Sequence, residues 1–389
     1  MKNSKNKKIR VLRLIGSLIP KFGGPQNAII SSSEELIKEG FQVDIITCDN
    51  EKFNLKKNKK INIINIKSFI GKNYRFSLKL FLWLLKNKKN YDFFLIHGLW
   101  QFNSLLARLL LKKYFIYTHG QLDEFFSFNF FKKIKKQIYW TLIEKSNLKN
   151  AKSILLTSFG EQKQLKKTYV NTNGIKKKII TYGIINRKYN KLKCIEKFNN
   201  KFAFFKNKSF YLFLGRFHEK KGCDIIINAI NIIGNDFKSI VLLAGPHEDV
   251  EYIKYLKSII NKHGLKNKII LTGPIYNDLK FGAILSSKGM LLASHGENFG
   301  VSIVESLSMG KPVLLTSKVN IASHIIKAKA GLMSLNTIDS FSKKLMEFEK
   351  INKNDLRKMS KNALSCYKKN FSLSKSKKSL GEAIRNELD

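Results

Sequence analysis

The feature that most constrains this 389-residue chain is an alternation of short apolar runs with helical runs, which occurs twice. The first series begins at residues 8–16 and continues to about residue 182. A second series begins at residues 210–214, after a polar stretch around residues 185–207. Alternation of this kind is typical of a doubly wound parallel α/β sheet. The sequence therefore predicts two α/β domains in tandem, each with its own core.

The apolar runs predict strands and the periodic runs between them predict helices. In the first domain we expect strands at 8–16, 41–47, 61–66, 92–96, 114–118, 153–157 and 179–182. The helices expected there are 26–39, 76–87, 102–111, 125–149 and 161–169. In the second domain we expect strands at 210–214, 239–243, 268–272, 289–293 and 312–316. The helices expected there are 224–233, 250–263, 277–287, 301–309, 340–348 and most of 354–388.

The chain is strongly basic, with 72 Lys and Arg against 28 Asp and Glu and a formal net charge of +44. Residues 1–190 contain 38 of the basic and 11 of the acidic side chains, so the first half is the more basic one. Nucleic acid, an anionic membrane surface and acidic substrates are the partners that such a charge favours. Lys, Asn, Ile and Phe are abundant throughout, so a biased composition would explain part of the charge without any partner.

The segment 294–305 contains two carboxylates, Glu297 and Glu305, separated by seven residues. The apolar run before it predicts a strand and the run after it a helix, so a turn falls at residues 298–300. Glu297 then precedes the helix, and Glu305 lies about two turns inside it. A helix N-terminus favours an anion such as a phosphate. Carboxylates on both sides suit a ligand whose hydroxyl groups flank a diphosphate, as in a nucleotide sugar.

A second charged turn, residues 215–222, follows the apolar run at 210–214 and precedes a helix. It contains Arg216 and Lys221. Arginine can donate two hydrogen bonds to phosphate oxygens, and lysine supplies a point charge. The two side chains could hold a diphosphate and stabilise it as a leaving group. An exposed charged turn without a ligand explains the same residues equally well.

Small and polar residues follow several strands of the first domain. Gly23 and Gly24 come after the first strand, where glycine permits close approach to a ligand or simply a tight turn. His97 and His119 follow two neighbouring strands, and residues 123–124 are acidic. In open α/β sheets, ligands bind at the carboxyl ends of the strands. A lone histidine is usually structural, but two at neighbouring strand ends favour a site.

The sequence contains no motif typical of a metal site or of a catalytic serine nucleophile. It contains no D-x-D, no zinc-type spacing and no G-x-S-x-G nucleophile elbow. Its four cysteines lie far apart and fit reduced thiols in a cytoplasmic protein. No apolar run is long enough to span a membrane. No nucleic-acid recognition module is present, so nucleic acid is not expected as a partner.

Lysine runs at residues 56–60, 132–136 and 176–178 accompany apolar side chains. Clustered lysines each gain about 1 kcal/mol near an anionic leaflet. A solvated basic face is the alternative explanation. We expect peripheral contact with an anionic membrane surface.

Taken together, these residues closely resemble family 4 of the retaining glycosyltransferases, which have the GT-B fold. The features that resemble the family occur in its order over nearly the whole chain; they are Gly23-Gly24, His119-Gly120, Gly215-Arg216 with Lys221-Gly222, the spacing of Glu297 and Glu305, and Gly310-Lys311-Pro312-Val313. Residues 97–101 and 318–321 resemble a bacterial subgroup associated with surface-polysaccharide gene clusters.

The resemblance implies a role for each matched residue. Arg216 and Lys221 would bind the donor diphosphate, and Glu305 would hold the ribose hydroxyls. Glu297 would contact the transferred sugar, and His119 would line the sugar pocket near the anomeric centre. The backbone groups that would approach the sugar or the phosphates belong to Gly24, Asn298, Phe299, Gly300 and Val301. No residue is expected to bind a metal.

The same resemblance implies two Rossmann-like domains that face each other across a donor-binding cleft. Residues 1–187 would bind the acceptor, residues 188–370 the nucleotide sugar, and residues 371–389 would form a helix crossing back to the first domain. The implied reaction moves a hexose from a GDP- or UDP-sugar, with retention and without metal or cofactor. The implied acceptor is a lipid-linked surface glycan at the inner face of the plasma membrane. Two alternatives stay open, namely an inactive binding or assembly protein of the same fold and a nucleotide-sugar epimerase.

Overall fold

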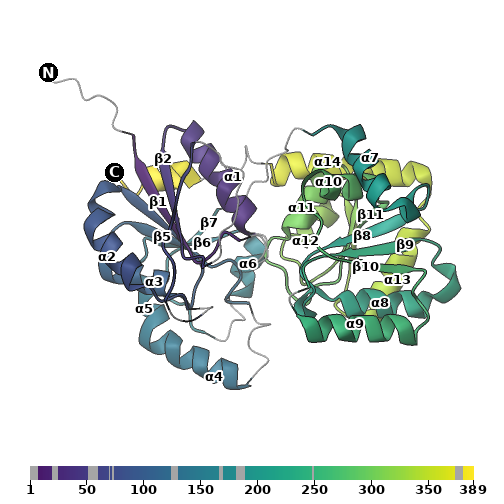
Figure 1. Cartoon of the computed structure of the whole chain (residues 1–389), viewed down its shortest axis with the longest axis horizontal. Helices are drawn as coiled ribbons and strands as arrows, with labels where there is room; N and C mark the ends of the chain where they lie inside the picture. The colour runs from purple at the N-terminus through teal and green to yellow at the C-terminus, as the bar shows by residue number, and fades with distance from the viewer. Residues whose placement is uncertain are drawn as a thin grey trace. The chain divides into compact units, whose positions relative to one another are not determined.

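The structure is a computed structural model that describes residues 8–19, 25–50, 60–69, 71, 74–123, 130–165, 170–180, 189–247, 249–372 and 380–389. The chain divides into two compact units, the first made of residues 1–183 with 373–389 and the second of residues 184–372. Figure 1 shows a sheet flanked by helices in each unit. Both sheets are parallel throughout, so the prediction of two α/β domains is confirmed.

The first unit is built on a seven-stranded sheet in the order β3-β2-β1-β4-β5-β6-β7. Its strands are β1 (Arg10–Ile15), β2 (Gln42–Thr47), β3 (Asn62–Asn65), β4 (Phe93–His97), β5 (Tyr114–Tyr117), β6 (Ser153–Leu156) and β7 (Lys177–Ile179). β1 pairs with both β2 and β4, so the strand order changes direction between β1 and β4. Open α/β sheets bind ligands at such a switch point.

Helices cover both faces of this sheet. They are α1 (Pro25–Lys38), α2 (Leu78–Asn87), α3 (Phe102–Leu110), α4 (Phe130–Tyr139), α5 (Lys145–Asn150) and α6 (Phe159–Gln164). Ile45 of β2 packs in one cluster with Ile29 of α1, whereas Ile46 packs in a second cluster with Leu80 of α2 and Leu106 of α3. Successive strand residues therefore face opposite helical layers.

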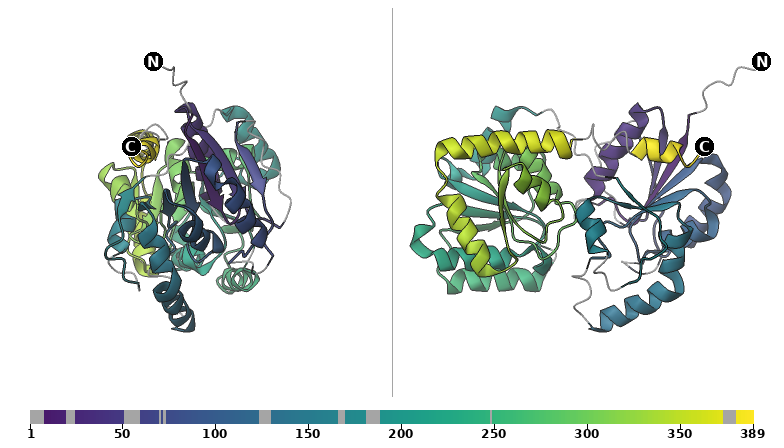
Figure 2. Two further views of the ribbon diagram at one scale, coloured as in Figure 1. Left: turned by 90° about the vertical axis from the view of Figure 1, so that its left-hand side faces the viewer. Right: turned by 180° about the vertical axis from the view of Figure 1, so that it is seen from behind.

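The C-terminal residues 380–389 pack on the first unit. Arg385 lies 3.4 Å from Glu39 at the end of α1, and Lys178 of β7 pairs with Glu387 at 2.7 Å. Figure 2 shows this last helical turn beside α1 from two further sides.

The helix expected at residues 125–149 is interrupted. α4 gives way to a π-helical turn at Trp140–Glu144, after which α5 continues; residues 124–129 lie outside the described part. The turn buries Trp140 and brings the Glu144 carboxylate within 3.1 Å of the Ser104 hydroxyl. A purely periodic pattern does not reveal such an insertion.

The last strand of the first unit begins earlier than expected. β7 spans residues 177–179 rather than 179–182, and the expected residues 181 and 182 lie outside the described part. Two lysines occupy this edge strand, where charged side chains are tolerated because one edge has no neighbour.

The second unit has a six-stranded sheet in the order β10-β9-β8-β11-β12-β13. Its strands are β8 (Phe210–Leu214), β9 (Ile240–Ala244), β10 (Ile269–Thr272), β11 (Gly289–Leu292), β12 (Val313–Thr316) and β13 (Gly331–Ser334). β8 pairs with both β9 and β11, so this sheet has its switch point between β8 and β11. Its helices are α7 (Lys191–Lys201), α8 (Cys223–Ile233), α9 (Val250–Lys262), α10 (Asn277–Ser286), α11 (Val301–Ser308), α12 (Ala322–Lys327), α13 (Ile338–Glu349) and α14 (Lys353–Asn370).

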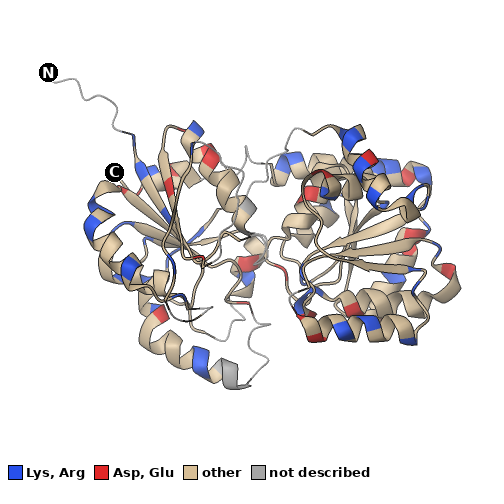
Figure 3. Cartoon of the chain, viewed as in Figure 1, with Lys and Arg blue, Asp and Glu red and all other residues tan. Residues whose placement is uncertain are grey.

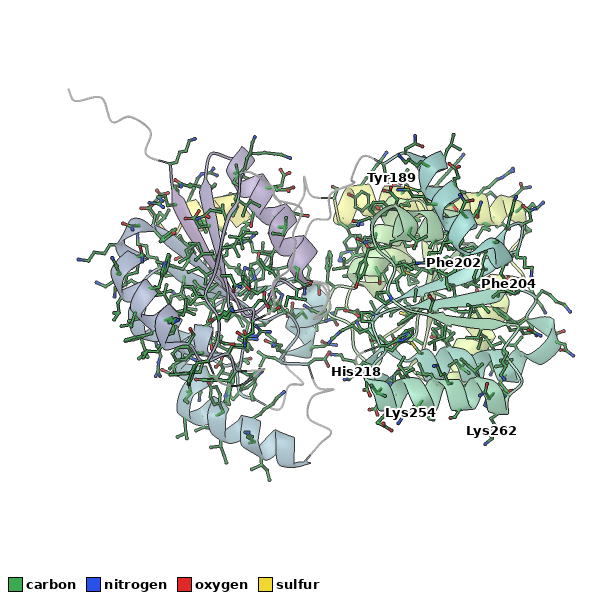
Figure 4. The ribbon with its side chains drawn as sticks, viewed as in Figure 1. Tyr189, Phe202, Phe204, His218, Lys254 and Lys262 are labelled. Carbon is green, nitrogen blue, oxygen red and sulfur yellow. The ribbon has the colours of Figure 1, made fainter. Side chains whose placement is uncertain are left out.

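Three of these elements were not expected. α7 lies inside the stretch that was predicted to be a polar linker. The sequence pattern did not reveal this helix because only Cys194 and Phe198, one turn apart, are fully buried in it. Figure 4 shows Tyr189, Phe202 and Phe204 around it. β13 is a half-buried edge strand and α12 has six residues, so neither gives a strong periodic signal. Among the described helices, none has the length and apolar character that crossing a membrane requires.

Candidate active site

The second unit brings two of the expected loops together at its switch point. Gly222 ends the loop after β8 with a φ of +65°, and a Cβ there would lie 2.0 Å from the carbonyl oxygen of Ala293. The Ser294 hydroxyl donates to the carbonyl of Lys220 at 2.7 Å, and the His295 amide donates to the same oxygen at 2.9 Å. The backbone that precedes Lys221 is therefore held against the loop that leads to Glu297.

Lys221 and Glu297 form an ion pair across these loops. Their side chains are only 18% and 15% exposed. Burial would raise the pKa of Glu297, but the charge and hydrogen bond of Lys221, the charge of Lys220 and the Gly300 amide outweigh it, so this pKa lies below its ordinary value. Glu297 is therefore a carboxylate at neutral pH.

The backbone of Glu297 is also held in place. Its amide donates to the carbonyl of Lys318 at 3.1 Å, and its carbonyl accepts from the Asn320 amide at 2.9 Å. The Asn320 side-chain amide also lies 3.4 Å from the Asn298 oxygen. This short parallel bridge with residue Val319 fixes the position from which the carboxylate extends.

α11 begins directly after this turn. Gly300 precedes it with a φ of +67°, and no side chain caps the helix. Phe299 is buried and packs edge-on against Phe371, with ring centroids 6.0 Å apart. The first amides of a helix have no partner within it, so the amides that begin at Val301 are available to an anion.

Glu305 lies inside α11, as its spacing from Glu297 predicts. Lys280 of α10 donates to its carboxylate at 2.6 Å, and both side chains are largely buried. Nothing in the sequence around Lys280 indicates this pairing, because the two residues belong to different helices and lie 25 positions apart in the sequence.

Arg216 follows β8 and is exposed, without a hydrogen-bond or ion-pair partner among the described residues. The neighbouring His218, which Figure 4 labels, caps the turn by accepting from the Lys220 amide at 3.1 Å. Burial, and then the charge of Arg216, lower the pKa of His218. The Arg216 guanidinium is therefore available for a ligand.

In the first unit the two expected histidines meet. His97 Nδ1 lies 3.1 Å from His119 Nε2, and the rings stack with centroids 5.3 Å apart. Tyr117 stacks on His97 at 5.1 Å. Burial, and then the charge of Arg13, lower the pKa of His119 to about 3; burial is also the main cause of the lowered pKa of His97. Both imidazoles are therefore neutral at physiological pH.

Arg13 is a functional candidate that the sequence analysis missed. It lies in the middle of β1 and is fully buried. Its Nη1 donates to the carbonyl of Ile29 at 2.6 Å and to the hydroxyls of Ser32 and Ser33 at 2.8 and 2.5 Å. An arginine within an apolar strand is the signal that could have identified it, since a buried guanidinium is rare without polar partners.

Glu161 is a second residue that was missed. Its carboxylate accepts from the Thr118 hydroxyl at 2.6 Å and from the Gly120 amide at 3.1 Å, on either side of His119. It also accepts from the amide and hydroxyl of Thr157 at 2.7 and 3.0 Å. His119 has a φ of +50°, which is uncommon for a residue other than glycine. Glu161 therefore holds the turn that presents His119.

The loop after β1 is anchored at its start by Asp49. This buried carboxylate accepts from the Leu18 amide at 2.9 Å, from the Thr47 hydroxyl at 2.5 Å and from the Ser17 hydroxyl. Gly23 and Gly24, farther along the loop, lie outside the described residues, as does Glu124. Asp123 is buried, with its amide donating to the carbonyl of Gly120 at 3.1 Å.

Within the described ranges, no three His, Cys, Asp or Glu residues come together as a metal site would require.

Two family models match the chain. One described as Glycosyltransferase Family 4 matches residues 22–183, and one described as Glycosyl transferases group 1 matches residues 195–365. The chain belongs to the glycosyltransferases of group 1 and family 4. The matched ranges coincide with most of the two structural units.

Individual relatives are distant. The chain is 22% identical over 151 residues to the alpha-1,3/1,6-mannosyltransferase ALG2 of Dictyostelium discoideum, a match covering 35% of the chain and 36% of that protein. The chain thus spans about a third of that relative's length. It is 27% identical over 274 residues to an uncharacterised 41.2 kDa protein in the cps region of Klebsiella pneumoniae, covering 68% of the chain and 71% of that protein.

One solved structure aligns with both units of the chain. Anabaena Alr3699/HepE in complex with UDP-glucose aligns with a TM-score of 0.77 at 14% identity, over 97% of this chain and 100% of that one. At this identity the likeness concerns the fold. The two Rossmann-like units are those of a GT-B glycosyltransferase, as the sequence predicted.

Proposed function

We propose that this protein is a retaining glycosyltransferase that moves a hexose from a nucleotide-diphospho-sugar to a growing lipid-linked glycan. The observation that carries the proposal is the Lys221–Glu297 pair, which spans the switch point of the second unit directly before α11. Membership of the family and the fold of a relative solved with UDP-glucose support a nucleotide-sugar donor.

The second unit offers a partner for each part of such a donor. The diphosphate would lie at the amides of residues 298–301, between Arg216 and Lys221. Glu305 would accept hydrogen bonds from the ribose hydroxyls with the carboxylate oxygen that Lys280 leaves free. Glu297 would accept from hydroxyls of the transferred sugar and share Lys221 with the phosphates.

The proposed reaction breaks the bond between the anomeric carbon and the diphosphate oxygen. The acceptor oxygen bonds to the same face of that carbon, and its proton passes to the departing phosphate oxygen. Arg216 and Lys221 stabilise the negative charge that develops there, an effect worth about 10²–10³ in rate for a single donor group. Because these cations neutralise the diphosphate, the mechanism requires no metal. Glu297 orients the transferred sugar.

The donor would be a GDP- or UDP-hexose and the acceptor a lipid-linked saccharide at the inner face of the plasma membrane. The relative from a cps region and the net charge of +44 support this location. On this proposal the protein is cytoplasmic and binds the membrane peripherally.

The proposal is tested by incubating the full chain with each GDP- and UDP-hexose, with and without a lipid-linked saccharide. Mass spectrometry should show an acceptor heavier by one hexose, and NMR should show the donor's anomeric configuration in the product. An isomerised nucleotide sugar formed without acceptor would identify an epimerase instead. Donor binding without any product would identify a binding protein.

A further inference from the structure

One helical layer of the first unit has an outer surface with an unusual composition. α2, α3 and the α4–α5 segment cover the same face of the sheet, with α3 in contact with both neighbours. Their inner sides contribute Leu80, Leu84, Leu106, Trp140 and Leu148 to one core cluster. The opposite sides of α2, α3, α4 and the π-helical turn form what we call the outer face.

Aliphatic side chains form stripes on this outer face. In α2 the exposed residues are Leu78, Leu82 and Leu85, whose spacing places them along one side of the helix. In α4 and the π-helical turn they are Ile134, Ile138 and Leu142, again one turn apart. In the described part of the first unit, the other exposed large apolar side chains are Phe69, Leu109 on α3, and Phe159. Most of the large apolar side chains that are exposed in the described part of the first unit therefore lie on this helical layer.

The same face is basic and lacks exposed carboxylates. Residues 60–152 contain 18 Lys and Arg but only four Asp and Glu. Of these four, Asp123 and Glu144 are buried, Asp92 accepts from the Arg10 amide at 2.8 Å, and Glu124 lies outside the described part. The exposed lysines on these helices, or in the turns that continue them, are Lys79, Lys86, Lys89, Lys135 and Lys149. Figure 3 shows basic residues along α2 and α4.

We infer that the outer face docks on the surface of an anionic lipid bilayer. A row of aliphatic side chains flanked by lysines binds favourably at the boundary between headgroups and acyl chains. There the aliphatic side chains are buried from water and the lysines are attracted to anionic headgroups. The purpose of this docking rests on the proposed function, because a lipid-linked acceptor would lie at the same surface. The binding itself depends only on the outer face.

Other occupants fit these side chains less well. The lysines could bind the phosphates of a nucleic acid. The exposed leucine and isoleucine side chains, however, make no favourable contact with phosphates and have no aromatic ring on which a base could stack. A second copy of the chain would bring lysines of one copy against lysines of the other, without carboxylates between them.

The test uses sedimentation of the full chain with vesicles of phosphatidylcholine alone and of phosphatidylcholine mixed equally with phosphatidylglycerol. The protein should sediment with the mixed vesicles, and added salt should weaken this binding. The double variant Leu82→Asp with Ile138→Asp should lose at least about tenfold in partition, because burial of even one such side chain is worth that factor.

Ile232→Asp is the matched control. Ile138 and Ile232 are both isoleucines on helices and both are 56% exposed, but Ile232 lies on α8 in the second unit. This control should bind vesicles as the unchanged protein does. Equal binding by the double variant, an equal loss in the control, or no binding to mixed vesicles would overturn the inference.

Two further readouts separate the alternatives. If the double variant loses binding to single-stranded RNA as well, or if it converts a dimer to a monomer in analytical ultracentrifugation, the outer face has another occupant and the inference is wrong. The rise in melting temperature with nucleotide sugar reports on the proposed function alone. Vesicle binding without such a rise would contradict the proposed function and leave the docking face standing.

Discussion

The carboxyl ends of the two sheets are built in opposite ways. In the second unit, Lys221 with Glu297 and Lys280 with Glu305 form ion pairs between elements that are distant in sequence. In the first unit, the corresponding ends present the neutral rings of His97 and His119. The second unit therefore presents charged side chains, which can also bind a polar ligand. The first unit presents uncharged rings that are packed among buried side chains.

The two units also differ in the contacts that fix the positions of these side chains. The charges of the second unit are positioned by backbone contacts, such as the two hydrogen bonds to the Lys220 carbonyl. In the first unit the turn that presents His119 is held by the buried carboxylate of Glu161, and the charge of buried Arg13 helps to keep both rings neutral. Substitutions of the ion-paired side chains in the second unit should therefore affect the reaction, whereas substitutions of the buried polar side chains in the first unit should affect stability.

The largest effect is expected from Glu297→Gln. The amide keeps the shape of the side chain but removes the negative charge, so kcat/KM for transfer should fall by about 10²–10³. Steady-state kinetics with the best donor measures this loss. Glu219→Gln, an exposed change in the same charged turn as Lys221, should leave the rate unchanged. Full activity in Glu297→Gln would show that the charge of the second unit is not used.

Gly222→Ala should destabilise the second unit by at least about 3 kcal/mol, because a Cβ would lie 2.0 Å from the Ala293 oxygen in a left-handed backbone. Gly264→Ala is the control, with the same φ of +65° but no atom within 4 Å of the added carbon. It should cost only about 1–2 kcal/mol. Urea unfolding of both variants measures the difference, and equal losses would mean that the two loops do not depend on their close contact.

Glu161→Gln should destabilise the first unit by about 2–3 kcal/mol, since it replaces a carboxylate that accepts four hydrogen bonds by an amide that cannot accept them all. Thr118→Val removes one of the four donors and should cost about 1–2 kcal/mol. Urea unfolding ranks the two variants. A Glu161→Gln protein as stable as the unchanged one would contradict the buried framework described for the first unit.

The smallest effect is a pH dependence of stability. The pKa of His119 is lowered to about 3 and that of His97 is also lowered, so the unfolded chain binds more protons below its ordinary histidine pKa. Stability should therefore fall as pH decreases from about 7.5 to about 5.5, by about 1.4 kcal/mol for each histidine. Urea unfolding at both values should show a smaller fall in His119→Gln. An unchanged pH dependence would mean that His119 is not held neutral by the fold.

The contrast also explains how much could be predicted from the sequence. The strands β8 and β11 are buried on both faces, so they appear as continuous apolar runs that are easily recognised. The site residues of the second unit follow such strands and are charged, and their spacing was sufficient to place Glu297 and Glu305. The Glu305–Lys280 pair could not be predicted, because it depends on how α10 packs against α11.

In the first unit less of the site could be predicted. Glu161 follows Ser158 in the pattern of an N-terminal helix cap, and the Ser158 hydroxyl does accept from the Glu161 amide at 3.1 Å. The contact of the carboxylate with the His119 turn, however, joins α6 to a loop that lies 41 positions away in the sequence. Likewise, the π-helical turn at 140–144 and the short helix α7 arise from packing that a periodic pattern does not contain.

We propose that Lys221 and Glu297 bind a nucleotide sugar and are not merely a structural ion pair. Exchanging the two charges in one chain, with Lys221→Glu and Glu297→Lys, tests it most directly. The melting temperature should stay close to that of the unchanged protein, because an ion pair can still form. No GDP- or UDP-sugar should raise that temperature, and transfer should be lost. An exchanged protein that still binds the donor and transfers the sugar would show that the pair has only a structural role.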